Sequence, residues 1–379
     1  MAAKQHEKIN GDPAALTFDR AVGELRRGRA VQVTDGSRGM IVAAVEAIQA
    51  ALFTRLVAAG AGRAVLLVTA ERAHAAGLSH QLGGPVAITF RAGVGLEQLR
   101  SAAGVGDSLP IDHSLFDVDG APDCVPLATA GFQLAKAGRL VPALVGFETA
   151  DAPGTDLIAI DTRDVEHHER VGHHSLQLVS RARVPLADAV DCEIALFRDE
   201  HSLAEHVAVL IGKPDAKNAV PVRLHSACLT GDLLASLRCD CGEQLRTAVA
   251  RIAKLGGGVL LYLDQEGRGI GLPNKLRAYV LQDEGLDTVD ADRHLGFLAD
   301  ERTYDVAAAL LHELGITRIK LLTNNPQKIS SLRDHGIEVA GRLPLVTNSN
   351  THNERYLRAK TERAGHLAEE WGRSLAGDS

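Results

Sequence analysis

Apolar residues over about the first 160 positions alternate between two patterns. Short continuous runs, such as 64–68 and 157–160, predict buried strands, and Ala-rich stretches of helical period lie between them. This alternation is typical of α/β or α+β domains. We expect a first domain over residues 15–174, preceded by a disordered N-terminus over residues 1–14.

The second half of the chain has clearer signals. Apolar residues at helical spacing over 245–255 stop at three glycines, 256–258, which predicts the end of a helix. The run 259–263 then predicts a buried strand. The same signals predict three further elements, which are a helix over 306–314, a strand over 319–322 and a helix from Pro326 to Gly336 with Asn325 as its cap.

A polar stretch over about 161–190 separates the two halves and predicts a linker. We place the domain boundary near residue 175, so that a second domain covers residues 175–370 and a tail covers 371–379. The predicted fold class is mixed α/β (α+β) with two domains, which the length of 379 residues allows.

Composition narrows the classes of partner. The formal net charge is -7, which argues against a broad surface for nucleic acid or anionic lipid. No apolar run approaches the roughly 20 residues of a membrane helix, and the N-terminus has no apolar core of a secretory signal. We therefore expect a soluble cytoplasmic protein that binds neither nucleic acid nor membrane, and a local basic cluster for any polyanionic ligand.

Three of the five cysteines are clustered and predict a zinc site. Cys228, Cys239 and Cys241 form the pattern C-x10-C-x-C, and thiolates suit zinc. Three ligands with one open position are typical of hydrolytic zinc, whose bound water ionises near neutral pH. His225 is the alternative to this interpretation, because a fourth ligand would make the site structural.

Glycines and basic residues downstream predict a binding site for phosphate. Gly267, Gly269 and Gly271 let backbone amides approach a ligand closely, with Arg268 and Arg277 nearby. A solvated helix face remains open for Arg277. The string TNNPQK over 323–328 places a hydroxyl group, amides and a lysine at a helix N-terminus, which also suits an anion.

Together these residues resemble the GTP cyclohydrolase II family. The matching strings are RLHSACLTGD (223–232), SLRCDCGEQL (236–245), QEGRGIGLPNKLRAYVLQDEGLDT (265–288), LGFLADER (295–302) and LLTNNPQK (321–328). The resemblance implies that Cys228, Cys239 and Cys241 bind one zinc ion with water in the fourth place, which removes His225 from the metal. It places GTP, as substrate, against Arg223, Leu224, His225, Ser226, Ala227, Gln244, Glu266, Gly267, Arg268, Thr288, Thr323 and Lys328.

The reaction implied is zinc-dependent hydrolysis of GTP at guanine C8. Formate and pyrophosphate are released, Mg²⁺ accompanies the substrate phosphates, and the product is the diamino-ribosylamino-pyrimidinone phosphate that opens riboflavin biosynthesis. The family further implies that Arg302 attacks the α-phosphate, Asp300 accepts the proton and Tyr279 supports chemistry at C8. A guanidinium stays protonated, so we expect Arg302 to stabilise charge in the transition state at the least.

Two positions depart from the family. Ala227 stands where the family usually has Glu, and Asp264 stands where a basic or neutral residue is usual. Neither is a predicted zinc ligand or Arg302, so we expect activity to survive. Substrate affinity and ring-opening efficiency are the properties that these two positions are placed to alter.

The first half is similar, more weakly, to dihydroxybutanone phosphate synthase. The strings FDRAVGELRRGRAVQVTD, CVPLATAG and PALVGFE carry this similarity. That family's acidic loop is reduced here to residues 35–38, its metal-binding histidine is missing around 128–131, and only Glu148 remains. Without paired carboxylates, metal-assisted chemistry has no ligands. We predict a degenerate domain without synthase activity, with a structural or dimerising role.

Two other functions stay open at this stage. One is a diverged nucleobase ring-opening hydrolase, and the other is a nucleotide-binding regulator without turnover. A homodimer is expected from both resemblances. A second metal site at His167, His168, His173 and His174 is less favoured than solvated side chains.

Overall fold

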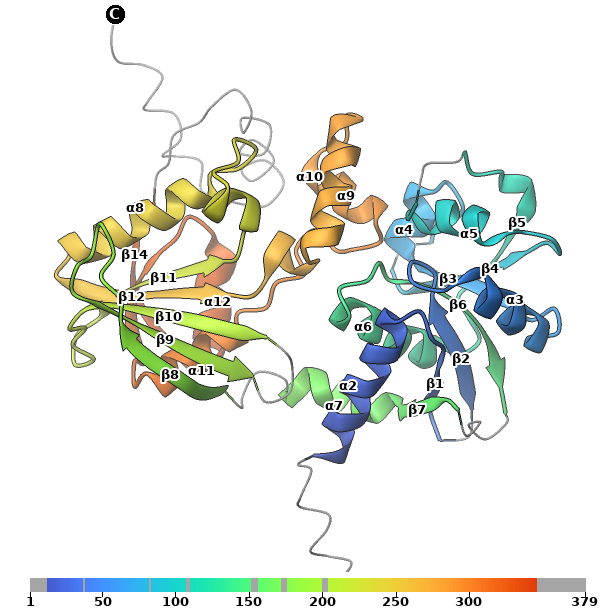
Figure 1. Ribbon diagram of the computed structural model, residues 1–379, viewed down its shortest axis with the longest axis horizontal. Coiled ribbons are helices and arrows are strands. Elements are labelled where there is room, and N and C mark those ends of the chain that lie inside the picture. Colours follow the sequence, from blue (N-terminus) through green and yellow to red (C-terminus); the bar gives the residue numbers. More distant parts are fainter. Residues whose placement is uncertain are drawn as a thin grey trace, which may run out of the picture. The chain divides into compact units, whose positions relative to one another are not determined.

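The computed structural model describes residues 12–36, 38–81, 83–106, 110–150, 156–171, 176–199 and 204–345. The chain divides into two compact units (Figure 1). The first unit combines Met1–Val171 with Pro273–Asp300, and the second combines Gly172–Leu272 with Glu301–Ser379. Most of the expected disordered N-terminus (1–11) and the expected tail (371–379) lie outside the described residues.

The first unit is built on a seven-stranded sheet with the strand order β5-β4-β3-β6-β2-β1-β7. Its neighbouring strands are antiparallel except for β1 and β7, which are parallel. The strands are β1 Val31–Thr34, β2 Gly39–Ala44, β3 Val65–Thr69, β4 Pro85–Phe90, β5 Phe116–Gly120, β6 Ala143–Thr149 and β7 Ile158–Asp161.

Helices cover both faces of this sheet, because side chains that alternate along each strand enter two separate cores. The helices of the unit are α2 Pro13–Arg26, α3 Ala50–Ala59, α4 Ala70–Ala75, α5 Leu96–Ala103, η1 His113–Leu115, α6 Val125–Ala137, α7 Thr162–Val171, α9 Leu272–Asp283 and α10 Thr288–His294. Leu66 and Val68 pack with α3, α4 and α5, whereas Leu67 packs with α2, α6 and α7.

The second unit has its own seven-stranded sheet, in the order β14-β13-β11-β12-β10-β9-β8. Four neighbouring strands, β14, β13, β11 and β12, are parallel, and β10, β9 and β8 continue the sheet in antiparallel pairs. The strands are β8 Leu176–Arg183, β9 Cys192–Asp199, β10 Glu205–Gly212, β11 Val220–Ser226, β12 Gly257–Leu263, β13 Arg318–Leu322 and β14 Glu338–Leu343.

The helical elements of this unit are η2 Leu229–Leu233, α8 Cys241–Lys254, η3 Glu266–Gly269, α11 Asp305–Glu313 and α12 Pro326–Asp334. One apolar core joins the sheet to α11 and α12, and a second joins the opposite face to α8. The predicted helices and strands of this half are confirmed, and the Asn325 side chain caps α12 by accepting from Gln327 N at 2.9 Å. The mixed α/β fold class is therefore confirmed.

The polar stretch over about 161–190, which the sequence predicts to be a linker, holds the boundary between the two units after Val171, but much of it is regular structure. It contains helix α7 and strand β8, and α7 packs against α2. Polar residues dominate α7, yet Val165 on its inner side is fully buried, so a narrow apolar stripe suffices to fix the helix. His167 and His168 lie on α7, whereas His173 and His174 lie outside the described residues. In the described part of the chain, no helix combines the length and apolar composition that crossing a membrane requires.

Candidate active site

The candidate site lies where parallel strands of the second unit end. Because β11, β12 and β13 run parallel, their carboxyl ends meet at one edge of the sheet, where α/β proteins commonly bind ligands. Cys228 follows β11, Glu266 follows β12, and Thr323 and Lys328 follow β13. The topology thus gathers residues that are up to 100 positions apart in the sequence.

The three thiols of the predicted zinc site converge. The Sγ atoms of Cys228, Cys239 and Cys241 all lie within 4.8 Å of one another, and Cys228 and Cys239 are 3.7 Å apart. Zinc–sulfur bonds of about 2.3 Å in a tetrahedron place sulfurs about 3.8 Å apart, so the spacing fits zinc. His225 is not a member of this group among the described residues.

Two further observations describe the group of thiols. The hydrogen-bonding contact with Cys228 raises the pKa of Cys239 to about 11, so that without a neighbouring cation this thiol stays protonated at neutral pH. Gly231 lies against the group, since a Cβ at this position would stand 2.7 Å from Cys239 Sγ and 3.1 Å from Cys228 Sγ. Glycine leaves the sulfurs the room that they need.

Two buried carboxylates hold the loop that begins at Cys228. Asp232 accepts a hydrogen bond from Cys228 N at 3.0 Å and another from Tyr262 Oη at 3.0 Å. Glu266 accepts from Leu229 N at 2.6 Å. The first thiol is therefore fixed through its backbone from two sides.

His225 belongs to the same network. Its Nε2 lies 3.0 Å from Asp232 Oδ1, and its ring stacks on Tyr262 with centroids 5.6 Å apart. A carboxylate only accepts, so Nε2 carries the proton. Burial lowers the pKa of His225, which keeps the ring neutral. Its buried Nδ1 has no hydrogen-bond partner among the described residues.

Buried cations lie beside the thiols. Arg223 donates to Leu322 O at 3.0 Å and to Gln244 Oε1 at 2.5 Å, and Gln244 in turn donates to Asp240 Oδ2. Burial lowers the pKa of Arg223 to about 10, while the charge of nearby Asp240 and Cys241 opposes that shift. Arg223 therefore remains charged at neutral pH.

Lys328 and Arg302 flank Tyr304. The Lys328 Nζ lies 5.4 Å from the centre of the Tyr304 ring and donates to Leu224 O at 3.0 Å. The guanidinium carbon of Arg302 lies 5.8 Å from the same ring centre. Thr323 is buried, and its Oγ1 accepts from Asn325 N at 3.0 Å. This corner of the second unit combines positive charge with a helix N-terminus, which favours anions.

The glycine-rich loop has an unusual backbone. Gly267 and Arg268 both have positive φ, of 63° and 62°, and a side chain in that region costs conformational energy. Glu301 N donates to Arg268 O at 3.1 Å, and a Cβ on Gly269 would stand 2.9 Å from the Glu301 backbone. The loop is therefore held against the residue that precedes Arg302.

The structure gathers most of the predicted site residues in the second unit. Ala227 N donates to Leu263 O at 2.8 Å, and the buried Ser226 Oγ has no partner among the described residues. Three predicted residues belong instead to the first unit. Tyr279 is on α9 with Lys275 Nζ 5.7 Å from its ring centre, Thr288 begins α10, and Asp300 is the last residue of that unit.

Sequence reasoning assigned no role to Gly231, Asp232 or Tyr262. Asp232 lies inside a string that resembles the family, but its hydrogen bonds with Cys228 N and Tyr262 appear only once β11 and β12 are paired.

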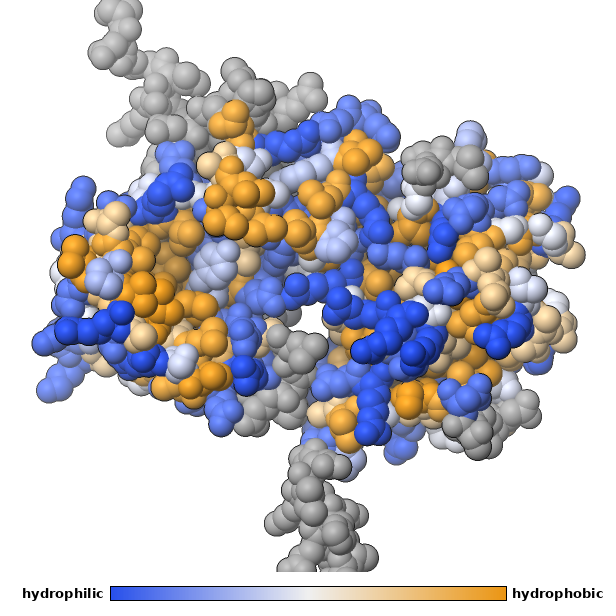
Figure 2. Space-filling view, viewed as in Figure 1, coloured by the Kyte–Doolittle hydropathy of each residue, from blue (hydrophilic) through white to orange (hydrophobic). Residues whose placement is uncertain are grey.

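Figure 2 shows apolar side chains gathered on a surface of the second unit. The exposed leucines of the loop between the first and second thiol are Leu229, Leu233, Leu234 and Leu237.

Comparison with known proteins identifies the family. The model of the GTP cyclohydrolase II family matches residues 177–344. A GTP cyclohydrolase-2 of Azospirillum brasilense is 44% identical over 367 residues, which cover 94% of this chain and 95% of that protein. This chain belongs to the GTP cyclohydrolase II family. The family assignment confirms the enzyme class that the sequence predicted.

Other members of the GTP cyclohydrolase II family differ in how much of the chain they match. A GTP cyclohydrolase-2 of Xylella fastidiosa (strain 9a5c) is 41% identical over 95% of this chain and 89% of its own length. One from Azotobacter vinelandii is 57% identical over 171 residues, which are 45% of this chain and 82% of that protein. The family therefore includes chains with no counterpart to about half of this one.

Solved structures also match. A two-domain 3,4-dihydroxy-2-butanone 4-phosphate synthase from A. baumannii aligns with 87% of this chain and 99% of its own, at 17% identity and a TM-score of 0.32. A TM-score of this size does not establish a shared fold. The degenerate synthase-like character of the first half remains a prediction.

Proposed function

We propose that the protein hydrolyses GTP at guanine C8 and releases formate and pyrophosphate, giving the diamino-ribosylamino-pyrimidinone phosphate at the start of riboflavin biosynthesis. The names of the full-length relatives support the substrate. The observation that carries the proposal is the group of three thiols at the sheet edge where buried Arg223 and Lys328 also lie.

In this proposal, Cys228, Cys239 and Cys241 hold one zinc ion, as their sulfur spacing allows. Zinc in such a site supplies a water molecule that ionises near neutral pH. Mg²⁺ accompanies the substrate phosphates. Asp232 and Glu266 fix the position of Cys228 before substrate arrives, which lowers the cost of reorganisation during the reaction.

Substrate recognition is assigned to both charged and neutral groups. Lys328, Arg268 and Thr323 bind phosphate oxygens, and Arg223 orients Gln244. Glu266 already accepts from Leu229 N and from its own neighbour Gly267 N, yet two carboxylate oxygens have further lone pairs for guanine N–H groups. The segment from Leu224 to Ala227 lines the same site.

Arg302, Asp300 and Tyr279 complete the proposed catalytic set. Arg302 stabilises charge at the α-phosphate, Asp300 accepts a proton and Tyr279 supports attack at C8. Absence of synthase activity from the first half, a cytoplasmic location and a homodimer stay predictions. Light scattering of the purified chain would test the homodimer.

The decisive experiment is incubation of the zinc-loaded full chain with GTP and Mg²⁺, followed by assay of formate and pyrophosphate and mass spectrometry of the pyrimidine product. We expect one formate and one pyrophosphate for each GTP consumed. GTP binding without either product contradicts the proposal and favours a regulator. A product that retains the formyl group indicates a diverged ring-opening hydrolase.

A further inference from the structure

A segment of the GTP cyclohydrolase II sequence folds with the other half of the chain. Residues Pro273–Asp300, hereafter the docked segment, belong to the first unit together with Met1–Val171. They contain most of α9 and all of α10, and α10 packs against α4 (Figure 1). The chain leaves the second unit after Leu272 and returns to it at Glu301, so both ends of the docked segment are tied to the unit that holds the thiols.

Arg72 makes the first of two polar attachments. Its guanidinium donates to Ser101 O and Ala102 O at the end of α5 and to His294 O at the end of α10, each at 2.8 Å. The side chain is 2% exposed, and burial lowers its pKa to about 10, so it remains cationic at neutral pH. A buried cation is favourable only where acceptors replace water, and one of these three acceptors belongs to the docked segment.

The backbones approach closely around this arginine. Thr69 Oγ1 donates to Gly296 O at 2.8 Å, and a Cβ on Gly296 would stand 3.0 Å from that Oγ1. A Cβ on Gly104 would stand 3.0 Å from His294 O. Leu295 and Phe297, on either side of Gly296, are each 1% exposed. Two glycines and two buried apolar side chains therefore give the contact a specific shape.

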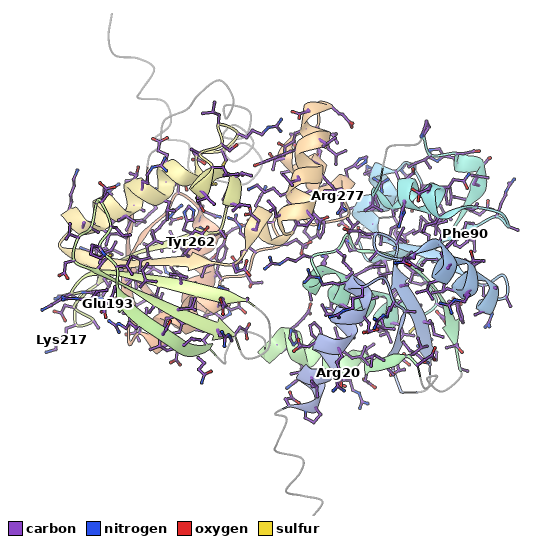
Figure 3. The ribbon with its side chains drawn as sticks, in the orientation of Figure 1. Arg20, Phe90, Glu193, Lys217, Tyr262 and Arg277 are labelled. Carbon is purple, nitrogen blue, oxygen red and sulfur yellow. The ribbon has the colours of Figure 1, made fainter. Side chains whose placement is uncertain are left out.

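Glu46 makes the second attachment, at α9. Its Oε1 accepts from Arg277 Nη2 at 2.8 Å, while its Oε2 accepts from Val141 N at 2.9 Å (Figure 3 labels Arg277). The fully buried Asn274 donates to Arg139 O at 3.0 Å and accepts from Arg277. Arg277, which the sequence offered as a phosphate ligand or a solvated residue, is thus paired with a carboxylate of the N-terminal half.

We propose that the N-terminal half is a supporting surface for the docked segment, and that GTP turnover depends on this support. The inference rests on the proposed function, because Tyr279 and Asp300 are the docked-segment residues assigned there to catalysis. Such a role needs no synthase chemistry. It requires only Glu46, Thr69, Arg72 and the surface around them.

The test uses two variants of the full chain, each with a matched control. Arg72→Met removes the buried cation. Arg100→Met removes a guanidinium of α5 that, among the described residues, bonds to Val45 O, Ile48 O and Glu97, all in the N-terminal half. Glu46→Gln weakens the Arg277 pair but still accepts from Val141 N, and Glu97→Gln weakens the Arg100 pair. Three readouts are compared, which are amide hydrogen exchange over 273–300, kcat/KM for GTP, and zinc affinity.

We expect exchange over 273–300 to accelerate at least tenfold in Arg72→Met and about threefold in Glu46→Gln, because charged hydrogen bonds are lost. We expect kcat/KM to fall by similar factors, and zinc affinity to stay within twofold because all three thiols lie in the second unit. The controls should change exchange in 273–300 and turnover by less than twofold.

Unchanged exchange in both test variants, or accelerated exchange with unchanged kcat/KM, overturns the inference. Equal effects in Arg100→Met and Arg72→Met also overturn it, since they would indicate general destabilisation of the N-terminal half. If the wild-type chain releases no formate, the proposed function fails instead. The exchange measurement then still decides whether Glu46 and Arg72 hold the docked segment.

Discussion

Replacing Asp232 with asparagine tests the network beneath the first thiol. The Asp232 side chain is 7% exposed and accepts from three donors, which are Cys228 N, His225 Nε2 and Tyr262 Oη. An asparagine side chain is nearly the same size but carries no charge, and its NH₂ group must face one of these three donors. The substitution therefore disturbs the thiol loop without removing side-chain volume.

The magnitude follows from the hydrogen bonds. A hydrogen bond to a charged group contributes about 1.5–3 kcal/mol and a neutral one about 0.5–1.5 kcal/mol, so three weakened bonds amount to about 3 kcal/mol. Only part of this loss reaches the metal, since the loop also has Glu266 to hold it. We expect zinc to bind about 10- to 100-fold more weakly, as for other residues that orient metal ligands.

Zinc affinity is measured by competition with a chromophoric chelator at pH 7. Asp215→Asn is the matched control, because Asp215 is an exposed turn residue of the same unit whose side-chain partners, in the part of the chain that the structure describes, lie in its own turn. Tyr262→Phe, which removes one donor of three, should give a smaller loss of about threefold to tenfold. Affinity of Asp232→Asn within twofold of wild type would refute the reasoning.

Two further predictions concern a steric and a titrating contact. Gly231→Ala should weaken zinc binding at least tenfold, as measured by chelator competition, because the new Cβ would stand 2.7 Å from Cys239 Sγ. In the control Gly95→Ala, the new Cβ stands 3.7 Å from Gln98 Oε1, and zinc affinity should not change. Equal zinc affinities of the two variants contradict the steric argument. Burial, together with the charge of Arg72, lowers the pKa of His294 to about 4 from its usual 6.5, so the folded state binds this proton less readily than the unfolded state does. The contribution of neutral His294 to the free energy of unfolding is complete above about pH 6.5 and is lost as pH falls toward 4, by about 1–2 kcal/mol after allowance for partial exposure. Between pH 7 and pH 5, the free energy of unfolding measured with denaturant should therefore fall less in His294→Gln than in the wild type. An equal fall in both proteins contradicts the assignment.

Sequence patterns predict the structure correctly where residues within one helix or strand determine it. Gly256, with a φ of 89°, follows the C-terminal end of α8, and Asn325 caps α12, because these signals act over a few residues. The sequence predicts a linker where the polar helix α7 lies, because Val165 is the one apolar side chain of this helix that is buried among the described residues, and one such position gives too weak a periodicity. Its stability comes from packing on α2, which the local sequence does not encode.

Some residues of the candidate site are predictable from the sequence, and others are found only in the folded structure. The three cysteines were predictable because ligand type and spacing are themselves the signal. Asp232, Tyr262 and Glu46 were not, since their partners are brought together only by strand pairing or by the docking of residues 273–300. Arg277 illustrates the limit, because a basic residue beside a glycine-rich loop predicted phosphate or solvent while the structure pairs it with Glu46.

The central claim is that the three thiols form the metal centre of a GTP ring-opening enzyme. Formate release from GTP by zinc-loaded Cys239→Ser, measured beside Cys192→Ser as a buried cysteine outside the group, tests it most directly. We expect Cys192→Ser to release formate at close to the wild-type rate. In Cys239→Ser, we expect the rate of formate release to fall at least 100-fold and less than one zinc ion to be bound per chain. Wild-type formate release by Cys239→Ser would contradict the claim.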